Sequence, residues 1–477
     1  MMTTASDAAF AALVETVRAG GVPVAAHSAK VLPGGVFVAM AGKAADGARF
    51  VPDAVARGAA WVVGVPGTAL PEGAAAHLVT VDDPRVALGT LAGARYGTDR
   101  MAMPVAAMTG TNGKTTVSYL LERLGAAAGK KVGVLGTVAY RWPGFSRDAS
   151  LTTPDCLTIH ENLAAMDRAG CDLAVMEASS HALDQDRLAG LSFAAAAFTN
   201  LTQDHLDYHR DMETYFAAKA KLFRHYLVDP ARAVLNFDDP FGLRLLHEFP
   251  QAIGYGLGKP PHGFSRLLVG GIREHGRDGL VLGASFGDEA FEVASPMPGR
   301  HNAANILAAM GLALALGLPA ETFASLADCH GAPGRLERIP NPAGLTVLVD
   351  YAHTPDALEN VLSAAREFTP GKLYAVFGCG GDRDRAKRPL MAAAVARHAD
   401  VAVLTSDNPR HEEPLAIMED AKPGLAGARR AILEPDRRRA IELALGAMRP
   451  EDVLVIAGKR SEEHTSELQS LACLVCR

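Results

Sequence analysis

The feature that most constrains this chain is a glycine loop at residues 109–116, TGTNGKTT, between an apolar stretch and a stretch of helical character. The apolar residues 105–108 predict a buried strand, and residues 115–128 predict a helix. A glycine turn at such a junction curls backbone N–H groups around an anion, and the helix N-terminus adds a favourable dipole. Methionine replaces the upstream glycine of the usual phosphate-loop pattern. We nevertheless predict a nucleotide site rather than a chance turn, with Lys114 reaching the β- and γ-phosphates and Thr115 ligating Mg²⁺.

Short apolar strands and helical stretches alternate along the rest of the chain. Strands that are apolar throughout are typical of parallel sheets covered on both faces by helices. We therefore predict an α/β fold of three domains: residues 1–99, a central phosphate-loop, parallel-sheet domain at 100–330, and a doubly wound, Rossmann-like domain at 331–459. Further strands are expected at residues 131–135, 173–176, 193–198, 233–237, 345–349, 373–377, 401–404 and 453–457, and further helices at 356–367 and 388–397.

Composition excludes several classes of protein. The formal charge is −6 and the pI is near 6.2, so no broad basic field is available to hold nucleic acid. Six cysteines in 477 residues do not make a disulfide scaffold and suit a reducing cytosol. Neither a signal peptide nor an apolar run of about 18 residues is evident, so we expect a cytoplasmic protein without a membrane partner.

Two polar clusters follow expected strands. Residues 177–181 (EASSH) follow one strand and residues 200–209 (NLTQDHLDYH) follow another. Ligands bind at the carboxyl ends of the strands in open α/β sheets, so two clusters at adjacent strand ends suit a metal–phosphate site. Taken alone, the second cluster is equally compatible with a zinc or hydrolase site or with a capped loop.

Together these motifs resemble the Mur ligase family, whose members use ATP to form amide bonds in peptidoglycan synthesis. The resemblance extends in order to about residue 459 and is strongest to members that add the third amino acid. It rests on the motifs at residues 109–116, 177–181, 200–209, 215–219 (YFAAK), 299–302 (GRHN), 334–337 (GRLE) and 350–356 (DYAHTPD). It implies an ADP-forming acid–amino-acid ligase that uses ATP and Mg²⁺, and we expect a monomer.

The resemblance also implies residue roles. Lys219 would be carbamylated, which turns a cation into a carboxylate that helps to hold Mg²⁺; without the resemblance, an exposed helix lysine is the simpler interpretation. The implied catalytic residues are Lys114, Glu177, His205, Lys219 and Arg335, and the implied metal ligands are Thr115, Glu177, His205 and carbamylated Lys219. The implied ATP contacts are Gly110, Thr111, Asn112, Gly113, Lys114, Thr115, Thr116, Asn302 and Asp350.

The resemblance makes residues 1–99 a UDP-binding domain and assigns the remaining substrates. The UDP-muramoyl dipeptide would contact Ala26, Ser28, Lys43, Ala44, Ala45, Thr152, Thr153, Ser179, Gln185 and Arg187, of which Ser28 matches the family better than its neighbours. The incoming amino acid would contact Arg383, Asp407, Asn408, Pro409, Arg410, Gly458 and Glu462. The third domain would therefore bind this amino acid.

Arg410, together with Arg383, favours meso-diaminopimelate over lysine as that amino acid. A guanidinium forks two hydrogen bonds onto the distal carboxylate of diaminopimelate but repels the distal ammonium of lysine. Two alternatives stay open, a lysine-adding Mur ligase and a folylpolyglutamate synthase-like ligase. A phosphate-loop GTPase would need an Asn-Lys-x-Asp motif, and the sequence has none.

The tail departs from the family after residue 459. Residues 460–470 (RSEEHTSELQS) resemble the in-frame translation of a sequencing-library adapter, so we expect residues 460–477 to be non-native and the third domain to be truncated. Glu462 would then occupy the position of a family glutamate by accident. The Cys-x-x-Cys at 473–476 is weak support for a metal or redox site.

Overall fold

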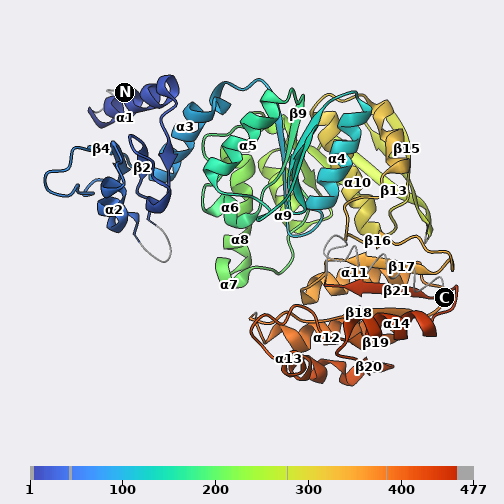
Figure 1. The fold of residues 1–477 in the computed structure, drawn as a ribbon. Helices are drawn as coiled ribbons and strands as arrows, with labels where there is room; N and C mark the ends of the chain where they lie inside the picture. The colour runs from blue at the N-terminus through green and yellow to red at the C-terminus, as the bar shows by residue number, and fades with distance from the viewer. Residues whose placement is uncertain (1–4, 42–45, 277, 383, 459–477) are drawn as a thin grey trace. The chain divides into compact units, whose positions relative to one another are not determined.

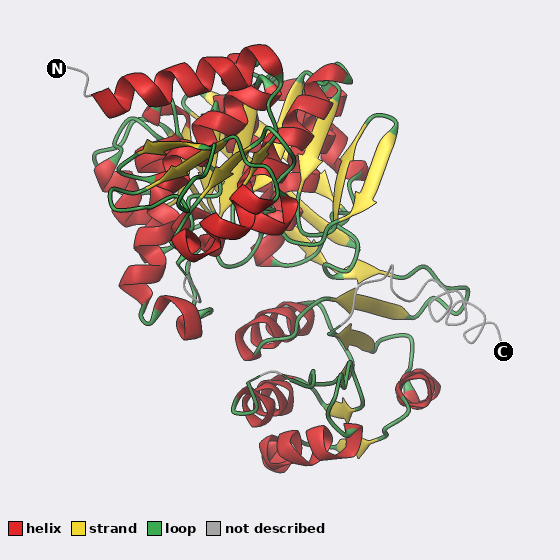
Figure 2. Cartoon of the chain, turned by 60° about the vertical axis from the view of Figure 1, so that its left-hand side comes forward, coloured by secondary structure: helices red, strands yellow, loops and turns green. Residues whose placement is uncertain are grey.

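The computed structural model describes residues 5–41, 46–276, 278–382 and 384–458, whose strands form three sheets of four, eleven and six strands (Figure 1). Helices accompany the strands of each sheet, which confirms the expected α/β class (Figure 2). Grouped by compactness, the chain forms two units, one of residues 1–110, 125–198 and 205–234 and one of 111–124, 199–204 and 235–477. The expected domain boundaries stay a prediction. No helix of the described residues is long and apolar enough to cross a membrane.

The four-stranded sheet is parallel, in the order β1-β2-β3-β4. Its apolar residues alternate between two faces: Val36 and Val38 pack in one cluster with residues of α1 and α3, and Phe37 packs in another with residues of α2. The elements of this region are α1 (Ala5–Gly20), β1 (Val24–Ala25), β2 (Val36–Val38), α2 (Val51–Ala56), β3 (Trp61–Gly64), β4 (His77–Thr80) and α3 (Pro84–Tyr96).

The eleven-stranded sheet has the order β15-β14-β13-β12-β11-β10-β5-β9-β6-β7-β8. Its strands are β5 (Val105–Thr109), β6 (Val132–Leu135), β7 (Ala139–Trp142), β8 (Phe145–Asp148), β9 (Leu173–Glu177), β10 (Ala195–Phe198), β11 (Ala233–Asn236), β12 (Ile253–Gly256), β13 (Leu267–Gly276), β14 (Gly279–Phe286) and β15 (Glu289–Ser295). Its helices are α4 (Lys114–Ala127), α5 (Cys156–Arg168), α6 (Ser180–Asp184), α7 (Leu206–His209), α8 (Met212–Lys221), α9 (Pro240–Glu248) and α10 (Arg300–Ala315).

Two features of this sheet were not expected. Strands β10, β5, β9 and β6 pair in parallel, as predicted, but the sheet also contains the antiparallel pairings β6-β7-β8 and β13-β14-β15, so it is mixed. In β14 the burial alternates through Leu280, Leu282 and Ala284, as is typical of antiparallel strands with one solvated face. The strands that precede the two polar clusters, β9 and β10, are also not adjacent, because β5 lies between them. Both clusters therefore flank the strand that leads into the glycine loop.

The six-stranded sheet has the order β16-β17-β21-β18-β19-β20 and is parallel except for β16. The last strand, β21, is therefore central. The elements are β16 (Glu337–Arg338), β17 (Thr346–Asp350), α11 (Pro355–Glu367), β18 (Leu373–Phe377), α12 (Lys387–His398), β19 (Val401–Leu404), α13 (Pro414–Ala421), β20 (Ala431–Leu433), α14 (Arg437–Ala447) and β21 (Val453–Ala457).

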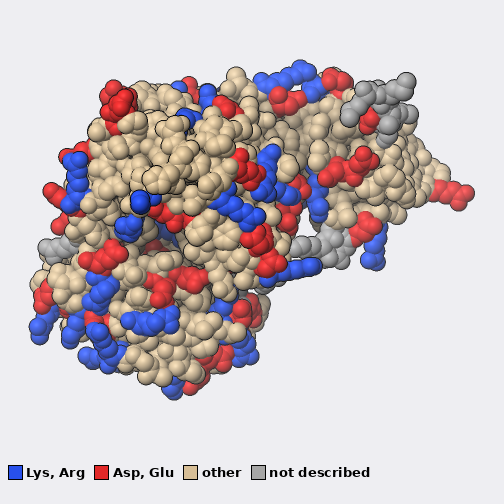
Figure 3. Space-filling model, turned by 180° about the vertical axis from the view of Figure 1, so that it is seen from behind, with Lys and Arg blue, Asp and Glu red and all other residues tan. Residues whose placement is uncertain are grey.

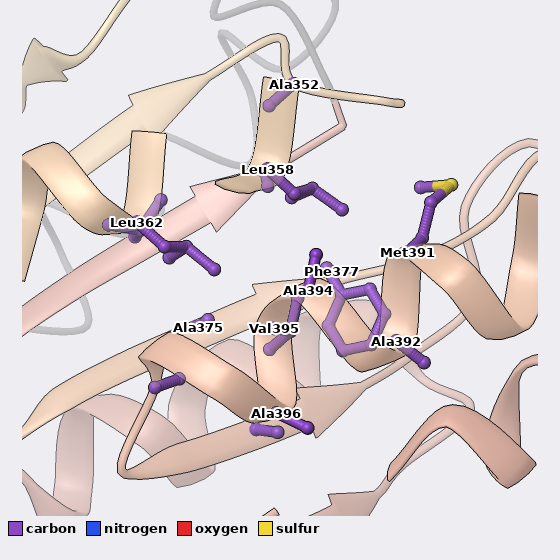
Figure 4. Packing of buried hydrophobic residues seen from close by; sticks show 14 of the residues in the cluster. Ala352, Leu358, Leu362, Ala375, Phe377, Met391, Ala392, Ala394, Val395 and Ala396 are labelled. Carbon is purple, nitrogen blue, oxygen red and sulfur yellow. The ribbon is translucent and has the colours of Figure 1, made fainter. Parts of the chain in front are cut away.

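Helices cover both faces of this sheet, as predicted. Phe377 packs with Leu358 and Leu362 of α11 and with Val395 of α12 in one cluster, whose closely packed side chains appear in Figure 4. Val376, the preceding residue of β18, packs on the other face with residues of α14. Burial of each such side chain contributes roughly 1.5–3 kcal/mol, so the sheet is a rigid base for the loops at its edges.

Candidate active site

The glycine loop has the predicted strand–loop–helix setting. Strand β5 is buried over its whole length, and α4 begins at Lys114. Gly110 and Gly113 have φ of +150° and +89°, and a Cβ at Gly113 would collide with the Asn305 amide oxygen. Only glycine therefore allows this loop to curl so closely.

Asn200 fastens the loop to the segment that follows β10. Its Oδ1 accepts from the Asn112 N–H at 2.9 Å, and its Nδ2 donates to the Asn112 carbonyl at 3.2 Å. The Thr111 N–H donates to the Asn200 carbonyl at 2.9 Å, and Lys114 Nζ donates to the Thr111 carbonyl at 2.9 Å. Thr115 and Thr116 are buried in the first turn of α4. The loop conformation is thus set by protein contacts.

Glu177 is a fully buried carboxylate at the carboxyl end of β9. The Thr137 N–H donates to Oε1 and the Thr137 hydroxyl donates to Oε2, each at 2.8 Å. A Cβ at Gly136 would overlap Oε1. Sequence reasoning missed Thr137, although it follows the strand expected at 131–135 in the same way as Glu177 follows its own strand.

Lys219 of α8 is 1% exposed, which excludes the interpretation of an exposed helix lysine. Its Nζ donates to the Gly110 carbonyl at 2.7 Å and lies 4.6 Å from the centroid of the Tyr215 ring. His205 has φ of +53°, a conformation that a non-glycine residue adopts only when its surroundings impose it. Its ring packs edge-on to His181, with centroids 4.9 Å apart. Among the described residues, no three His, Cys, Asp or Glu side chains gather as a metal site.

Hydrogen bonds connect five of the ten residues predicted to contact the UDP-muramoyl dipeptide, with Thr152 linked to the others through Thr137 and Glu177. The five are Thr152, Thr153, Ser179, Gln185 and Arg187. Thr153 Oγ1 donates to the Glu177 carbonyl at 2.7 Å and accepts from the Ser179 N–H at 3.0 Å. Arg187 donates to the Thr153 carbonyl at 3.0 Å and to Gln185 Oε1 at 2.7 Å, and the Thr152 and Thr137 hydroxyls are hydrogen-bonded at 3.1 Å. The structure therefore brings these residues together.

Tyr208 was not anticipated in this group, although it lies in the second polar cluster. Its hydroxyl accepts from Gln185 Nε2 at 3.0 Å and donates to Asp184 at 2.8 Å. In the N-terminal region, Ser28 is buried and Ala26 is partly buried. A hydrogen bond from the Ser28 hydroxyl helps to lower the pKa of Asp53. Lys43, Ala44 and Ala45 lie outside the described residues.

Asn302 and Asp350 are both buried. Asn302 Oδ1 accepts a hydrogen bond from Asn305 Nδ2 at 3.3 Å, and the Asn305 amide oxygen packs against Gly113. Asn302, a predicted ATP contact, is therefore linked to the glycine loop through Asn305. The Asp350 carboxylate accepts from the Leu336 and Ala352 N–H groups at 2.8 and 2.7 Å. Burial raises the pKa of Asp350, and the Arg335 charge opposes that shift. The Arg335 guanidinium lies over the Tyr351 ring, 5.4 Å from its centroid.

The predicted amino-acid residues lie in the loop after β19 and at the end of β21. Gly458 has φ of +99°, and a Cβ there would lie 3.4 Å from Asp407 Oδ2. The Arg410 guanidinium donates to the Gly381 carbonyl in the loop after β18. Asn408 and Pro409 also contact that loop. Arg383 and Glu462 lie outside the described residues.

Comparison with known proteins identifies three matching family models. They are the Mur ligase family catalytic domain at residues 23–96, the Mur ligase middle domain at 108–313, and the Mur ligase glutamate ligase domain at 334–460.

Similar proteins cover nearly the whole chain. The UDP-N-acetylmuramoyl-L-alanyl-D-glutamate–2,6-diaminopimelate ligase of Lawsonia intracellularis is 51% identical over 91% of this chain and 90% of its own length. The ligase of the same name from Thermosynechococcus vestitus is 48% identical over 91% and 86%. A solved structure of a ligase of this name is 31% identical, with a TM-score of 0.70 over 95% of both chains. A Mycobacterium tuberculosis folylpolyglutamate synthase bound to ADP shares the fold at 21% identity, with a TM-score of 0.63 over 83% of this chain and 95% of its own. The chain therefore belongs to the Mur ligase family.

Proposed function

We propose that this protein is an ATP-dependent, ADP-forming ligase of peptidoglycan precursor synthesis. It adds meso-2,6-diaminopimelate to the D-glutamate of UDP-N-acetylmuramoyl-L-alanyl-D-glutamate. The observation that carries the proposal is the 42–51% identity, over more than nine-tenths of the chain, to ligases named for this reaction. The buried lysine against the glycine-loop carbonyl and the buried carboxylate at the end of β9 support it.

The reaction has two chemical steps. The D-glutamyl carboxylate attacks the γ-phosphorus of ATP, which releases ADP and leaves an acyl phosphate. The amine of diaminopimelate then attacks the acyl carbon, and the tetrahedral intermediate expels phosphate as the amide forms. Lys114 and Arg335 neutralise the charge that develops on the phosphoryl group, and the rigid loops hold the reactants in line.

The donor set fits Mg²⁺. Mg²⁺ is usually held by one or two carboxylates together with substrate phosphates, so a cage of three protein carboxylates or histidines is not required. Thr115, Glu177, His205 and Lys219 would hold it, and the bound ion would neutralise phosphate charge. A buried ammonium at Lys219 would repel a divalent cation, so we assign carbamylation to this lysine. Intact-mass spectrometry under CO₂ should detect the added carboxyl group.

Phosphate release tests the assignment. Purified protein is incubated with ATP, the UDP-dipeptide and either meso-diaminopimelate or L-lysine, and separately with ATP, a reduced folate and glutamate. We expect product only from the UDP-dipeptide, and faster product with diaminopimelate. Equal rates with lysine would contradict the choice of amino acid, and turnover of the folate would contradict the choice of substrate class.

We also propose a monomer located in the cytoplasm. Four described cysteines, Cys156, Cys171, Cys329 and Cys379, are free and buried, as suits a reducing compartment. Charges of both signs are interspersed over the face in Figure 3, which favours small-molecule substrates over a nucleic acid. Sedimentation of the purified protein tests the oligomeric state.

A further inference from the structure

Arg388 of α12 is the largest side chain among those that are almost completely buried. Its side chain is 2% exposed, and it retains its charge because arginine does not deprotonate in proteins. A buried charge is tolerated only when hydrogen-bonding partners surround it. The identity of those partners indicates what this arginine does.

The partners come from three segments. Nη1 and Nη2 donate to Glu412 Oε2 and Oε1 at 2.9 and 2.6 Å, a fork onto the loop after β19. Nη1 also donates to Asp420 of α13 at 2.7 Å, and Nη2 donates to the Gly380 carbonyl after β18 at 3.4 Å. Arg388 therefore ties together the loops that leave two neighbouring strands.

The same two loops also touch directly, next to the predicted amino-acid site. The Asp382 N–H donates to Glu412 Oε1 at 2.6 Å, and the Gly381 N–H donates to the Asn408 carbonyl at 2.9 Å. The Gly381 carbonyl accepts from the Arg410 guanidinium. The direction of the Arg410 side chain thus depends on where the first loop lies.

Both loops contain a strained residue. Asp382 and Arg410 have φ of +50° and +49°, a left-handed conformation that is unfavourable for a non-glycine residue. Such residues persist where surrounding contacts over-determine them, as they do at functional sites. Glu412, and through it Arg388, holds the Asp382 N–H, while His411 contacts the Asp382 carboxylate. Arg410 is held by the Asn408 side chain and by the Gly381 carbonyl of the first loop.

Stability alone does not account for this buried charge. Desolvation offsets most of the attraction in a buried ion pair, and an apolar replacement is often equally stable. Arg388 Nε is also buried without a hydrogen-bond partner among the described residues. Buried guanidinium groups of this kind are better explained by the geometry they impose.

We propose that Arg388 is a positioning residue that sets amino-acid selectivity. By holding Glu412 and Gly380, it fixes the loop carbonyl that aims Arg410 at the distal carboxylate of the incoming amino acid. This inference rests on the proposed function, because it concerns the choice between diaminopimelate and lysine at the same site.

Two variants test the proposal. Arg388→Lys keeps the charge but cannot fork onto Glu412, and Glu412→Gln keeps the shape but turns an N–H toward the guanidinium. Arg397→Ala is the matched control, because Arg397 lies on the same helix and forms an exposed ion pair with Glu359. The measured quantities are kcat and KM for meso-diaminopimelate, L-lysine and ATP, with thermal unfolding alongside.

We expect both test variants to lower the selectivity for diaminopimelate over lysine by about tenfold or more, since small misplacements of binding groups have effects of this size. The loss should appear as a higher KM for diaminopimelate with an unchanged KM for ATP, and Arg397→Ala should match the wild type. Where lysine turnover is too slow to measure, the KM for diaminopimelate decides. An unchanged ratio and KM in Glu412→Gln would overturn the inference, even if Arg388→Lys fails to fold. A wild type that does not use diaminopimelate would instead refute the proposed function.

Discussion

Thr137→Val is the sharpest test of how Glu177 is held. Valine has nearly the shape of threonine but replaces the hydroxyl that donates to Glu177 Oε2 at 2.8 Å by a methyl group. The backbone N–H of residue 137 still donates to Oε1, so Glu177 loses one of its two contacts with this residue, and the 3.1 Å hydrogen bond to the Thr152 hydroxyl is lost as well. Thr137→Ser, which keeps the hydroxyl, is the matched control.

The expected magnitude follows from the burial of the carboxylate. A hydrogen bond to a charged group contributes about 1.5–3 kcal/mol, and Glu177 has no exposed surface on which water could replace it. We expect Thr137→Val to lower the free energy of unfolding by about 2 kcal/mol, or the Tm of this domain by about 4–8 °C. Because Thr137 orients a proposed Mg²⁺ ligand, metal affinity should also fall by about 10–100-fold.

Calorimetry measures the first effect, and titration with Mn²⁺ as a paramagnetic substitute for Mg²⁺ measures the second. Thr137→Ser should retain most of the wild-type Tm and metal affinity. If Thr137→Val unfolds at the wild-type temperature and binds Mn²⁺ equally well, the hydroxyl does not hold Glu177 in the way that the contact distances imply.

Three further predictions concern other parts of the molecule. Gly113→Ala should abolish ADP binding in calorimetric titration, because its Cβ would meet Asn305, whereas Gly129→Ala, at φ of +74° with open space around it, should bind ADP normally. Asn200→Ala should weaken ADP binding by about tenfold, since both of its amide hydrogen bonds to the glycine loop would be lost; unchanged affinity would contradict this. Burial lowers the pKa of His160, so the unfolded chain takes up the proton first and stability should fall as the pH drops below about 6.5, the usual pKa of histidine. The urea midpoint should depend less on pH in His160→Asn, and an equal dependence would contradict the assignment.

The strands and helices that were predicted from the sequence lie within about two residues of the observed bounds, but their neighbours in the sheets were not predicted. Strands β18, β19 and β21 were predicted with their observed bounds, because each is a short apolar run of the kind that a covered parallel sheet requires. That β21 lies between β17 and β18, and that β5 separates β9 from β10, depends on long-range pairing that no local pattern encodes. Burial in the antiparallel strand β14 alternates through Leu280, Leu282 and Ala284, but Val281 is also apolar, so the sequence does not show this alternation.

The residues of the site also fall into two groups, those that the sequence predicted and those that it did not. Motifs identified the side chains that are expected to contact ligands, such as Glu177 and Arg410. Their residue type and their position after a strand both indicate a ligand-binding role. The residues that orient them are polar side chains bonded to other protein groups: Thr137 to Glu177, Asn200 to the glycine loop, and Arg388 to Glu412. Residue type alone does not distinguish these residues from ordinary polar surface residues, because only the fold shows which loop or carboxylate each of them contacts. A ligand-binding side chain that follows a strand lies at the sheet edge, but the strand alone does not fix its orientation. A polar contact from a neighbouring segment must therefore hold it in place. In this protein, the variants most informative about specificity are therefore those of the residues that hold the loops.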